Sequence, residues 1–256
     1  MPLACEETSM SARHLRSWLC AMAFAAAPAK AATCTATGYV RDGIDLTAAY
    51  INPTSVTSPV DATGCNIGVY YDHNYVGTAE LQNVEIYGAN YFGVLVNGDA
   101  GDVALNIKNS SIHNIGEVPF NGAQHGVAVY YMAMNEFSAT GVIDGSNIYH
   151  YQKNGITVNG PGANVTVTDN VVTGEGRIDY IAQNGIQFGW EAMGRIAGNE
   201  VSGNYYDNCE GPGKSTCLWV SAGILLYDVN PLLYRGIALN ATNVLYDNQY
   251  NILIYK

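Results

Sequence analysis

Two short sequence motifs alternate along most of this chain, so its fold has to repeat as well. The first motif is a glycine followed by Val or Ile, and its copies begin at Gly68, Gly93, Gly126, Gly155, Gly185 and Gly223, with Asn251 in the last copy. The second motif is an apolar residue, a variable residue, then Asn, Asp or Gly, two more residues and another apolar residue. Such alternation is the signature of architectures in which one unit stacks on the next.

The middle position of the second motif predicts a tight bend. Asn, Asp and Gly tolerate left-handed backbone, so one such residue can turn the chain between two short strands. The copies of this position are Asn83, Asn109, Gly145, Asp169 and Gly198, with Ala241 as the exception. The next position is small and polar in most copies, which predicts a hydrogen-bonded ladder between repeats. Its copies are Val84, Ser110, Ser146, Asn170, Asn199 and Thr242.

The repeat predicts an all-β, single-domain fold, a right-handed parallel β-helix (solenoid) of about seven coils over residues 60–256. A β-sandwich is the alternative for short strands, but it would not repeat one bend residue in one register. Residues 32–59 are expected to form an N-terminal cap, with Ile44 to Tyr50 as a short helix or an extra strand. No cap follows the last coil, so we expect the long loops or a second copy, in a homodimer, to cover it.

Residues 1–31 have the features of a secretory signal peptide. A basic stretch at Arg13 and Arg16 precedes an alanine-rich apolar stretch, and Ala29 and Ala31 are small residues of the kind that signal peptidase requires. The apolar stretch is too short to span a bilayer in the mature protein. We therefore expect a secreted or periplasmic protein that has no membrane partner.

The cysteines that follow this segment agree with export. Four remain, and an even number in an exported chain suggests two disulfides. Sequence alone allows three pairings. We favour the two local pairs, Cys34–Cys65 and Cys209–Cys217.

The charge of the chain limits its partners. The formal net charge is −11, and nucleic acid is not expected because phosphate binding needs basic surface. An acidic polysaccharide would also be repelled, unless a local basic site or a bound Ca²⁺ reverses the field. No ligand set with transition-metal spacing occurs in the sequence.

Three coils carry inserts at the same turn. The connection from the bend motif to the next glycine position is short after Ile86, Ile148 and Val244, and longer in the other three coils. Equivalent turns stack in a solenoid, so the inserts should rise from one side and wall a groove. They span residues 115–121, 174–182 and 203–221.

The candidate site residues lie in and beside these inserts. If the residue after each glycine points inward, the residue two before it points outward, which gives an outward row of Gln124, Lys153 and Gln183. The next column, with His125, Asn154 and Asn184, is expected to point inward. The residues expected to bind substrate are Glu117, Asn121, Gln124, Tyr151, Gln183, Asn184, Tyr206 and Trp219.

Each candidate also has a structural interpretation. Lys153 could be a solvated charge, and Arg177 with Asp179 could be an ion pair within a loop. His125 could cap a ladder of asparagines. The aromatic residues of the third insert could pack the loop onto the sheets instead of binding a sugar.

Over Val60 to Tyr255 the alternating motifs resemble the bacterial secreted proteins with right-handed parallel β-helix repeats. That superfamily includes polysaccharide lyases, uronate epimerases, pectin-acting hydrolases and phage tailspikes. The resemblance is one of fold, and no signature, such as the paired aspartates of polygalacturonases, selects one family. It implies a carbohydrate-active protein whose partner is a polysaccharide or an oligosaccharide.

Three functions follow as hypotheses, with the lyase placed first. β-Elimination on a uronic-acid polysaccharide needs a base and a cation, for which Lys153 and Arg177 are the candidates, with His125 as the alternative base. Ca²⁺ at Glu117 or Asp179 could bridge to the substrate as a cofactor. A glycoside hydrolase would instead use paired carboxylates such as Glu117 and Asp179, or Asp179 and Asp207. The third hypothesis is a non-catalytic module that binds a glycan or a protein.

Overall fold

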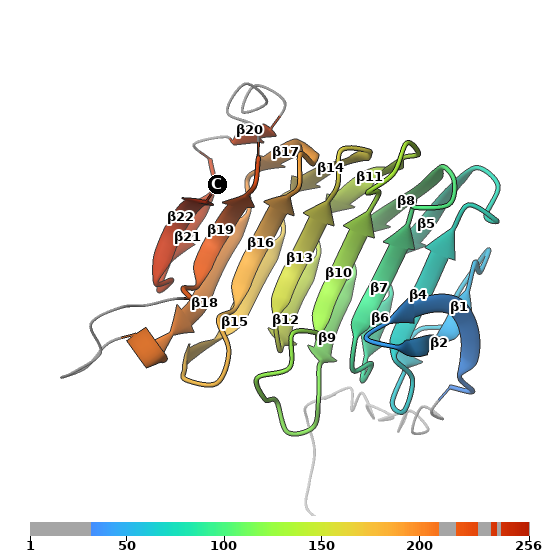
Figure 1. Cartoon of the computed structure of the whole chain (residues 1–256), viewed down its shortest axis with the longest axis horizontal. Coiled ribbons are helices and arrows are strands. Elements are labelled where there is room, and N and C mark those ends of the chain that lie inside the picture. Colours follow the sequence, from blue (N-terminus) through green and yellow to red (C-terminus); the bar gives the residue numbers. More distant parts are fainter. Residues whose placement is uncertain (1–31, 210–218, 230–236, 240–241, 256) are drawn as a thin grey trace, which may run out of the picture.

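The computed structural model describes residues 32–209, 219–229, 237–239 and 242–255, and nearly all of its regular structure is β-strand (Figure 1). The strands form three sheets, and consecutive strands of the chain mostly enter different sheets. From β4 onward, each sheet takes every third strand. All described strand pairs are parallel except β1 with β2, so the fold is all-β with large parallel sheets, as predicted.

The nine-stranded sheet, called the long sheet below, runs the length of the molecule. Its outer face is the side turned away from the interior. In spatial order its strands are β1 (Thr35–Arg41), β2 (Ile44–Ile51), β4 (Ile67–Asp72), β7 (Phe92–Asn97), β10 (Val127–Met132), β13 (Asn154–Asn159), β16 (Asn184–Gly189), β19 (Ala222–Tyr227) and β22 (Tyr250–Tyr255).

The other two sheets complete the enclosure of the interior. The six-stranded sheet contains β5 (Thr78–Gln82), β8 (Val103–Lys108), β11 (Ala139–Asp144), β14 (Ala163–Thr168), β17 (Met193–Ala197) and β20 (Ile237–Leu239). The seven-stranded sheet contains β3 (Val60–Asp61), β6 (Glu85–Tyr87), β9 (Ser111–Ile115), β12 (Asn147–Tyr151), β15 (Val171–Ile178), β18 (Glu200–Tyr206) and β21 (Val244–Tyr246), and a short 3₁₀ helix, η1 (Asp207–Cys209), follows β18.

The apolar residues of both motifs fill one continuous core. The long sheet contributes a column that pairs from strand to strand, and all of its members are fully buried: Val69, Val94, Val129, Ile156, Ile186 and Ile224. The seven-stranded sheet contributes a second buried column: Ile86, Ile112, Ile148, Val172 and Val201. Burial of these columns is the main favourable term in stacking the repeats.

The predicted bend is confirmed at five positions. Asn83, Asn109, Gly145, Asp169 and Gly198 have φ angles of 56°, 48°, 59°, 54° and 72°. They lie between a strand of the six-stranded sheet and the next strand of the seven-stranded sheet. Ala241 lies outside the described residues.

The predicted ladder is confirmed as well, with one correction. The main-chain nitrogen of Ser110 donates to Ser146 Oγ (3.2 Å), and the Asn170 amide donates to Asn199 Oδ1 (2.9 Å). Asn243, and not Thr242, takes the next step, because Glu200 pairs with Val244 and this register places Asn243 beside Asn199. The last copy therefore contains one more residue than the others.

One copy of the glycine motif was wrongly assigned. Val127 pairs with both Phe92 and Asn154, so Ala128 holds the position equivalent to Gly93 and Gly155. Gly126 lies two residues earlier, with a φ of 87°, in the connection to β10. Gly126-Val127 matches the glycine motif in sequence but does not occupy the equivalent position in the sheet.

The N-terminal segment forms a hairpin, β1 with β2, and β2 is the extra strand instead of the helix. It adds to the edge of the long sheet and covers the outer face of β4 and β7, where a second apolar cluster is buried (Figure 1). The buried members are Leu46, Ala48, Ile67, Tyr70, Tyr91, Phe92, Leu95, Val127 and Met132.

The predicted disulfide between Cys34 and Cys65 is confirmed and ties this hairpin to the first repeat. Cys217, the expected partner of Cys209, lies outside the described residues, as do residues 1–31, which were expected to form a signal peptide. In the part of the chain that the structure describes, no helix is long and apolar enough to cross a membrane.

The other end of the long sheet is open among the described residues. Ile252 and Ile254 continue the inward column of Ile224 and Leu226, but they are 43% and 51% exposed. A second copy of the chain could cover this apolar surface, but nothing in the structure tests the expected homodimer, which stays a prediction.

Candidate functional site

A groove of about 350 Å³ lies on the outer face of the long sheet. Its floor crosses from β10 to β22, and the hairpin limits it on the side of β7. The lining residues are Arg41, Gln124, Val127, Tyr130, Lys153, Asn154, Thr157, Asn159, Ala182, Asn184, Gln187, Trp190, Trp219, Val220, Leu225, Tyr227, Leu253 and Tyr255.

Two of the three inserts contribute to one wall of this groove. All three connect a strand of the seven-stranded sheet to the next strand of the long sheet, so they stack at one corner of the molecule. The second insert reaches the groove at Ala182 and the third at Trp219, whereas residues 115–121 of the first insert do not line it and Gln124 follows that insert. The predicted grouping along a groove is therefore observed for the second and third inserts.

The centre of the floor is a network of amides on β13 and β16. Asn154 pairs with Asn184 and Thr157 pairs with Gln187 in the sheet register. The Asn154 amide donates to Gln187 Oε1 (3.0 Å), and the Asn184 amide donates to Asn154 Oδ1 (3.2 Å). On the other side, the Asn159 amide donates to the hydroxyl of Tyr130 (3.0 Å). These amide side chains are only 3–9% exposed and bond to one another, so the network holds the polar floor of the groove in fixed positions.

The expected directions of two columns were wrong. Asn154 and Asn184 face the groove, because the inward positions are taken by Gly155 and Ile156 in succession. A Cβ on Gly155 would lie 2.6 Å from Val172 Cγ1 in the core, so this position faces inward and interrupts strand alternation. His125 does not belong to this column, since Val127 pairs with Asn154.

The predicted outward row of Gln124, Lys153 and Gln183 is also wrong, because these three residues do not lie side by side on one face. Gly126, and not Gln124, lies beside Lys153 and accepts its main-chain N–H. Gln183 is fully buried, where its amide donates to the carbonyl of Gln152 (3.2 Å) and its oxygen accepts from the Glu175 N–H (2.9 Å). It stabilises a turn and does not face the groove.

Lys153 is the candidate whose environment is most altered. Its ammonium donates to the carbonyl oxygen of Ala182, 2.9 Å away in the next repeat. Burial lowers the pKa of Lys153 to about 8, because desolvation disfavours the charged form. A lysine with such a pKa can act as a base near neutral pH.

Arg41 is the second cation of the groove and was not foreseen. It lies at the tip of the hairpin, with its guanidinium 5.2 Å from the ring centre of Phe92. One of its terminal nitrogens also approaches the carbonyl oxygen of Gln124 (3.5 Å). The Asp42-Gly43 turn beside it is a hairpin signal that could have revealed the turn, although not what the turn covers.

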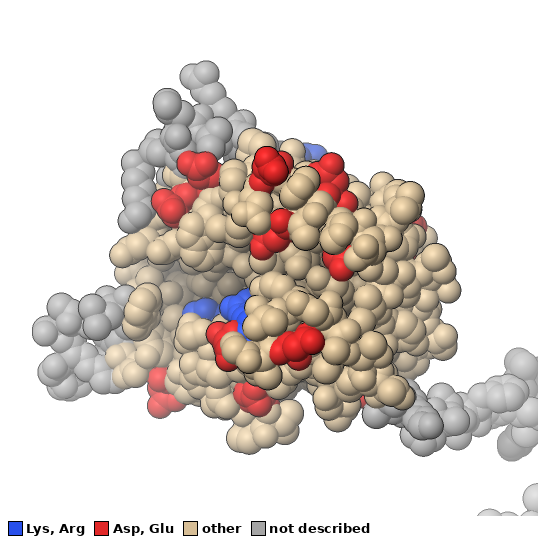
Figure 2. Space-filling model, turned by 45° about the vertical axis from the view of Figure 1, so that its right-hand side comes forward, with Lys and Arg blue, Asp and Glu red and all other residues tan. Residues whose placement is uncertain are grey.

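The groove has a charge opposite to that of the whole protein. Its described lining includes the cations Arg41 and Lys153 and no Asp or Glu, although the chain carries a formal charge of −11 and Arg41 is paired with Asp42 (3.9 Å) just outside the lining. Figure 2 shows basic side chains within a hollow on one face, with acidic side chains around it. A local positive site of this kind attracts an anionic ligand despite the overall charge.

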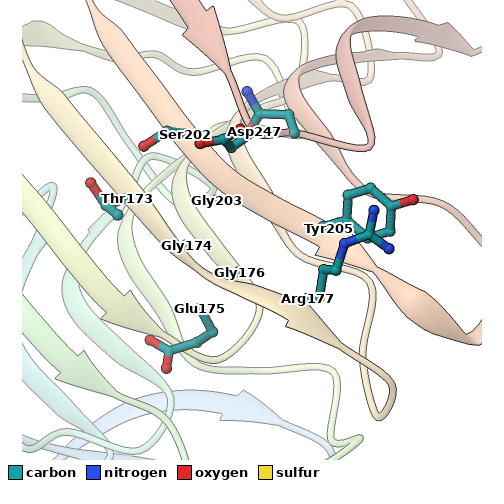
Figure 3. Close-up of a pocket in the computed structure, with 10 residues that line it drawn as sticks. Thr173, Gly174, Glu175, Gly176, Arg177, Ser202, Gly203, Tyr205 and Asp247 are labelled. Atoms are coloured by element: carbon teal, nitrogen blue, oxygen red, sulfur yellow. The ribbon is translucent and has the colours of Figure 1, made fainter.

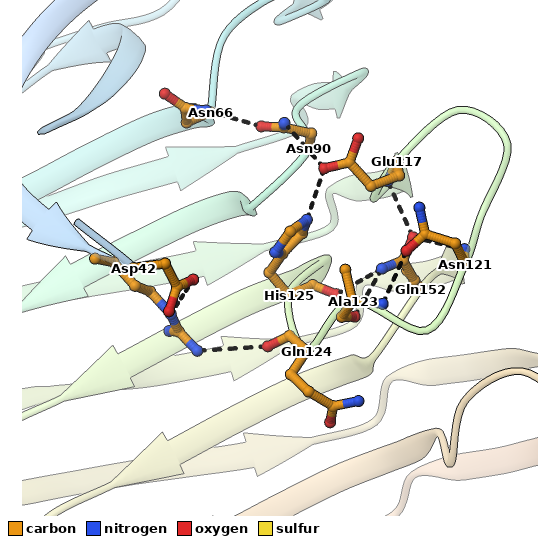
Figure 4. A network of polar contacts seen from close by, with 10 residues as sticks. Asp42, Asn66, Asn90, Glu117, Asn121, Ala123, Gln124, His125 and Gln152 are labelled. Atoms are coloured by element: carbon orange, nitrogen blue, oxygen red, sulfur yellow. Dashed lines mark hydrogen bonds and ion pairs between the residues drawn. The ribbon is translucent and has the colours of Figure 1, made fainter. Parts of the chain in front are cut away.

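The first insert is held by a polar network (Figure 4). Glu117 accepts from His125 Nε2 (2.7 Å) and from the Asn90 amide (3.3 Å). The His125 ring also stacks on Tyr91, with 3.9 Å between ring centres. Gln152 accepts from the main-chain nitrogens of both Glu117 and Asn121. These contacts explain His125 and Glu117 as residues that position the loop carrying Gln124.

Arg177 belongs to a different site. A second pocket, of about 740 Å³, lies on the outer face of the seven-stranded sheet and is lined by Thr173, Glu175, Arg177, Ser202, Tyr205 and Asp247 among others (Figure 3). The Arg177 guanidinium lies 3.8 Å from the ring centre of Tyr205 and pairs with Asp207 (3.3 Å). The structure therefore does not bring Arg177 together with Lys153.

The remaining candidates lie apart from the groove floor. Tyr151 is fully buried and its hydroxyl donates to Asn204 Oδ1 (2.7 Å), so it belongs to the core. The Tyr206 hydroxyl accepts from the amide of Asn208 in η1. Asp179 is exposed in the second insert. Asn121 is exposed as well and accepts from the Ala123 N–H (2.8 Å).

Sequence reasoning missed the groove residues inside the strands. Thr157, Asn159, Gln187, Trp190 and Tyr227 lie within or next to the strands that carry the glycine motif. Polar residues between buried Ile and Val were the available signal, since alternation predicts an outer face there.

The predicted Ca²⁺ site finds no matching ligand set. Among the described residues, no three His, Cys, Asp or Glu side chains gather as metal ligands. Ca²⁺ prefers six to eight oxygens, whereas Glu117 is held by two nitrogen donors.

No family model, curated protein or solved structure matches this chain.

Proposed function

We propose that this protein is an exported right-handed parallel β-helix that binds a uronic-acid-containing polysaccharide in the groove and cleaves it by β-elimination. The observation that carries the proposal is the groove lining, with two cations, no carboxylate among its described residues, and a floor of amides and aromatic rings. A sugar ring offers hydroxyls to the amides and apolar faces to the aromatic rings. A uronate adds the negative charge that the cations would neutralise.

The fold and location rest on separate observations. One strand per sheet per repeat is the connectivity of a parallel β-helix, and right-handed crossovers are the rule for parallel strands. The Cys34–Cys65 disulfide suits an oxidising compartment outside the cytosol. The disulfide is also consistent with the secretory signal expected in residues 1–31.

The chemistry follows from the two cations. Lys153, as the neutral amine, would take the proton from the carbon next to the uronate carboxyl group. The electron pair left on this carbon forms a double bond to the neighbouring carbon, whose bond to the glycosidic oxygen breaks. The proton on Lys153 then passes to the leaving oxygen. Arg41 would neutralise the carboxylate, whose charge grows as the proton leaves.

The groove supports elimination over hydrolysis. A glycosidase of the ordinary kind needs two carboxyl groups across the scissile bond, and the described lining of the groove contains none. Glu117 is bound to His125, and Asp179 does not line the groove.

The test is a screen of the purified protein against pectin, alginate, glycosaminoglycans and neutral glycans. Absorbance of the unsaturated uronate and release of reducing ends are followed together. We expect both signals to rise on one acidic glycan. Reducing ends without absorbance would refute elimination, and silence with measured binding would leave a non-catalytic glycan-binding protein.

A further inference from the structure

The groove is not uniform along its length. Its cations lie at the starts of the strands, since Lys153 immediately precedes β13 and Arg41 contacts Phe92, the first residue of β7. Its largest aromatic surface lies at the opposite ends, where Tyr227 and Tyr255 are the last residues of β19 and β22. Five steps along a strand separate these two ends by about 16 Å.

The aromatic residues form a continuous surface. Tyr227 stacks on Tyr255, with 5.5 Å between ring centres and 7° between planes, and Trp190 lies 5.2 Å from Tyr227. Trp190 is 38% exposed and Tyr255 is 56% exposed. Rings that line a groove and remain accessible can pack against the apolar face of a sugar.

Trp190 is held there by an unusual backbone. Its φ is 48°, and its main-chain nitrogen donates to the carbonyl oxygen of Tyr227 (3.1 Å). Left-handed backbone is unfavourable for a bulky residue, and Gly or Asn would be the ordinary choice. A residue with a conformational cost at the edge of a groove suggests a binding role.

A notch adjoins these rings. Gly189, beside Asn159 in the sheet, has no positive φ that would require glycine. A Cβ there would lie 2.8 Å from Asn159 Oδ1 and 3.3 Å from the carbonyl oxygen of Tyr227. The missing side chain lets these two oxygens lie close beside the rings, where Asn159 Oδ1 accepts from the Gln187 amide (3.4 Å) and the Tyr227 carbonyl accepts from the Trp190 nitrogen.

Two acidic residues adjoin the rings at this end, outside the described lining of the groove. Glu191 follows Trp190 and Asp228 follows Tyr227, and both side chains are exposed. Their main chains are hydrogen-bonded to each other, from the Glu191 nitrogen to the Asp228 oxygen (3.2 Å). Two carboxylates so placed repel a second uronate, whereas Lys153 and Arg41 attract one at the other end.

We infer that the surface formed by Trp190, Tyr227 and Tyr255 is a subsite for a neutral sugar, so that the ligand is a heteropolysaccharide with uronate and neutral sugars in one chain. The inference rests on the proposed function and narrows its substrate class. The cationic end holds the uronate, and the neutral neighbour stacks at the aromatic end. A homopolymer of uronate places a carboxylate beside Glu191 and Asp228.

The test is equilibrium binding by calorimetry at pH 6, where Lys153 is protonated and elimination is suppressed. The probes are a hyaluronan oligosaccharide, which alternates uronate and N-acetylhexosamine, and an oligogalacturonate of the same length. We expect the alternating glycan to bind at least about tenfold more tightly. Trp190→Asn should abolish most of that preference, and E191Q with D228N should raise affinity for oligogalacturonate several-fold.

Two controls separate binding from folding. Trp190→Asn relieves the unfavourable φ, so the melting temperature of this variant should be unchanged or higher. If Trp190 only stabilised the fold, the substitution would lower the melting temperature. Phe137→Ala removes an exposed ring outside the groove and should change neither affinity.

Equal or tighter binding of oligogalacturonate by the wild type would overturn the neutral subsite while sparing the proposed function. An equal loss of both affinities in Trp190→Asn would overturn it as well. If neither of these acidic glycans, nor any other acidic glycan in the screen, binds the wild type, the proposed function fails together with this inference.

Discussion

The Lys153 ammonium donates its hydrogen bond to the Ala182 carbonyl oxygen of the neighbouring repeat, at 2.9 Å. The acceptor is a neutral oxygen, so burial is not offset by an opposite charge at this contact, and the pKa falls to about 8. The bond also fixes where the side chain lies in the groove. Lys153 thus combines a fixed position in the groove with a lowered pKa.

Lys153→Met should abolish elimination. The substitution keeps the length of the side chain but removes the base, whose loss typically costs about 10²- to 10⁴-fold in turnover. Lys108→Met is the matched control, because Lys108 pairs with Glu80 on the six-stranded sheet, away from the groove. Turnover is measured by ultraviolet absorbance on the glycan that the screen identifies. Wild-type turnover in Lys153→Met would exclude Lys153 as the base.

The pH–rate profile should rise toward about pH 8 and then level. The neutral amine is the active form, and its fraction grows with pH up to the lowered pKa of Lys153. At pH 7 about a tenth of the lysine is neutral, so kcat/KM should increase almost tenfold per unit at lower pH. A profile that falls between pH 6 and 8 would point to a different base.

The stability of the fold should also rise with pH above about pH 8. In the unfolded chain, lysine has an ordinary pKa of about 10.4, so above about pH 8 the unfolded state binds more protons than the folded state. The free energy of unfolding then rises with pH. We expect urea unfolding at pH 8 and 9 to show this rise in the wild type relative to Lys153→Met, which shares all its tyrosines. Parallel curves for the two proteins would refute the lowered pKa.

Arg41→Gln should raise the KM for an acidic glycan about tenfold, with a smaller effect on a neutral one. The guanidinium supplies charge to the groove, and its contact with Phe92 contributes only about 0.5–1 kcal/mol to the hairpin. Arg177→Gln provides the comparison, because Arg177 lines the other pocket. Steady-state kinetics at low salt decides between them. A larger effect from Arg177→Gln would restore the pairing expected from sequence.

Asn170→Ala should destabilise the fold by at least about 2 kcal/mol. Asn170 is 1% exposed; its amide donates to the carbonyl of Ile143 (2.9 Å) and to Asn199, and its oxygen accepts from the Ser146 nitrogen (2.9 Å). Its removal leaves buried polar groups without partners, which cost about 1–3 kcal/mol each. Asn164→Ala, at an exposed position on β14, should cost under about 0.5 kcal/mol. Equal urea midpoints would show that the ladder contributes little.

The sequence predicted those parts of the fold that depend on local chemistry. Asn83 and Asp169 reveal a bend because few residue types tolerate their backbone, and Ser146 and Asn170 reveal a ladder for a similar reason. Register was harder, since the glycine motif at Gly126 matched the pattern two residues before its true equivalent, Ala128.

The candidate site was predicted in outline. Stacking of the inserts follows from the repeat, and Lys153 lies in the groove. The side on which Asn154 lies depends on how the strand bends at Gly155, which alternation does not reveal. Arg41 lines the groove because the hairpin packs over β7. No sequence pattern near Lys153 predicts this tertiary contact.

The hairpin has a further consequence for how a polymer can be processed. Arg41 approaches Gln124, just after the first insert, at the corner of the groove where Lys153 lies, whereas β22 is the edge strand of the long sheet among the described residues on the far side. Under the proposed function, a long glycan would then enter this groove with one end leading. Such entry would favour exolytic attack, in which small products leave from a terminus while the bulk polymer shortens slowly. Viscosity would then fall late, long after unsaturated ends begin to accumulate.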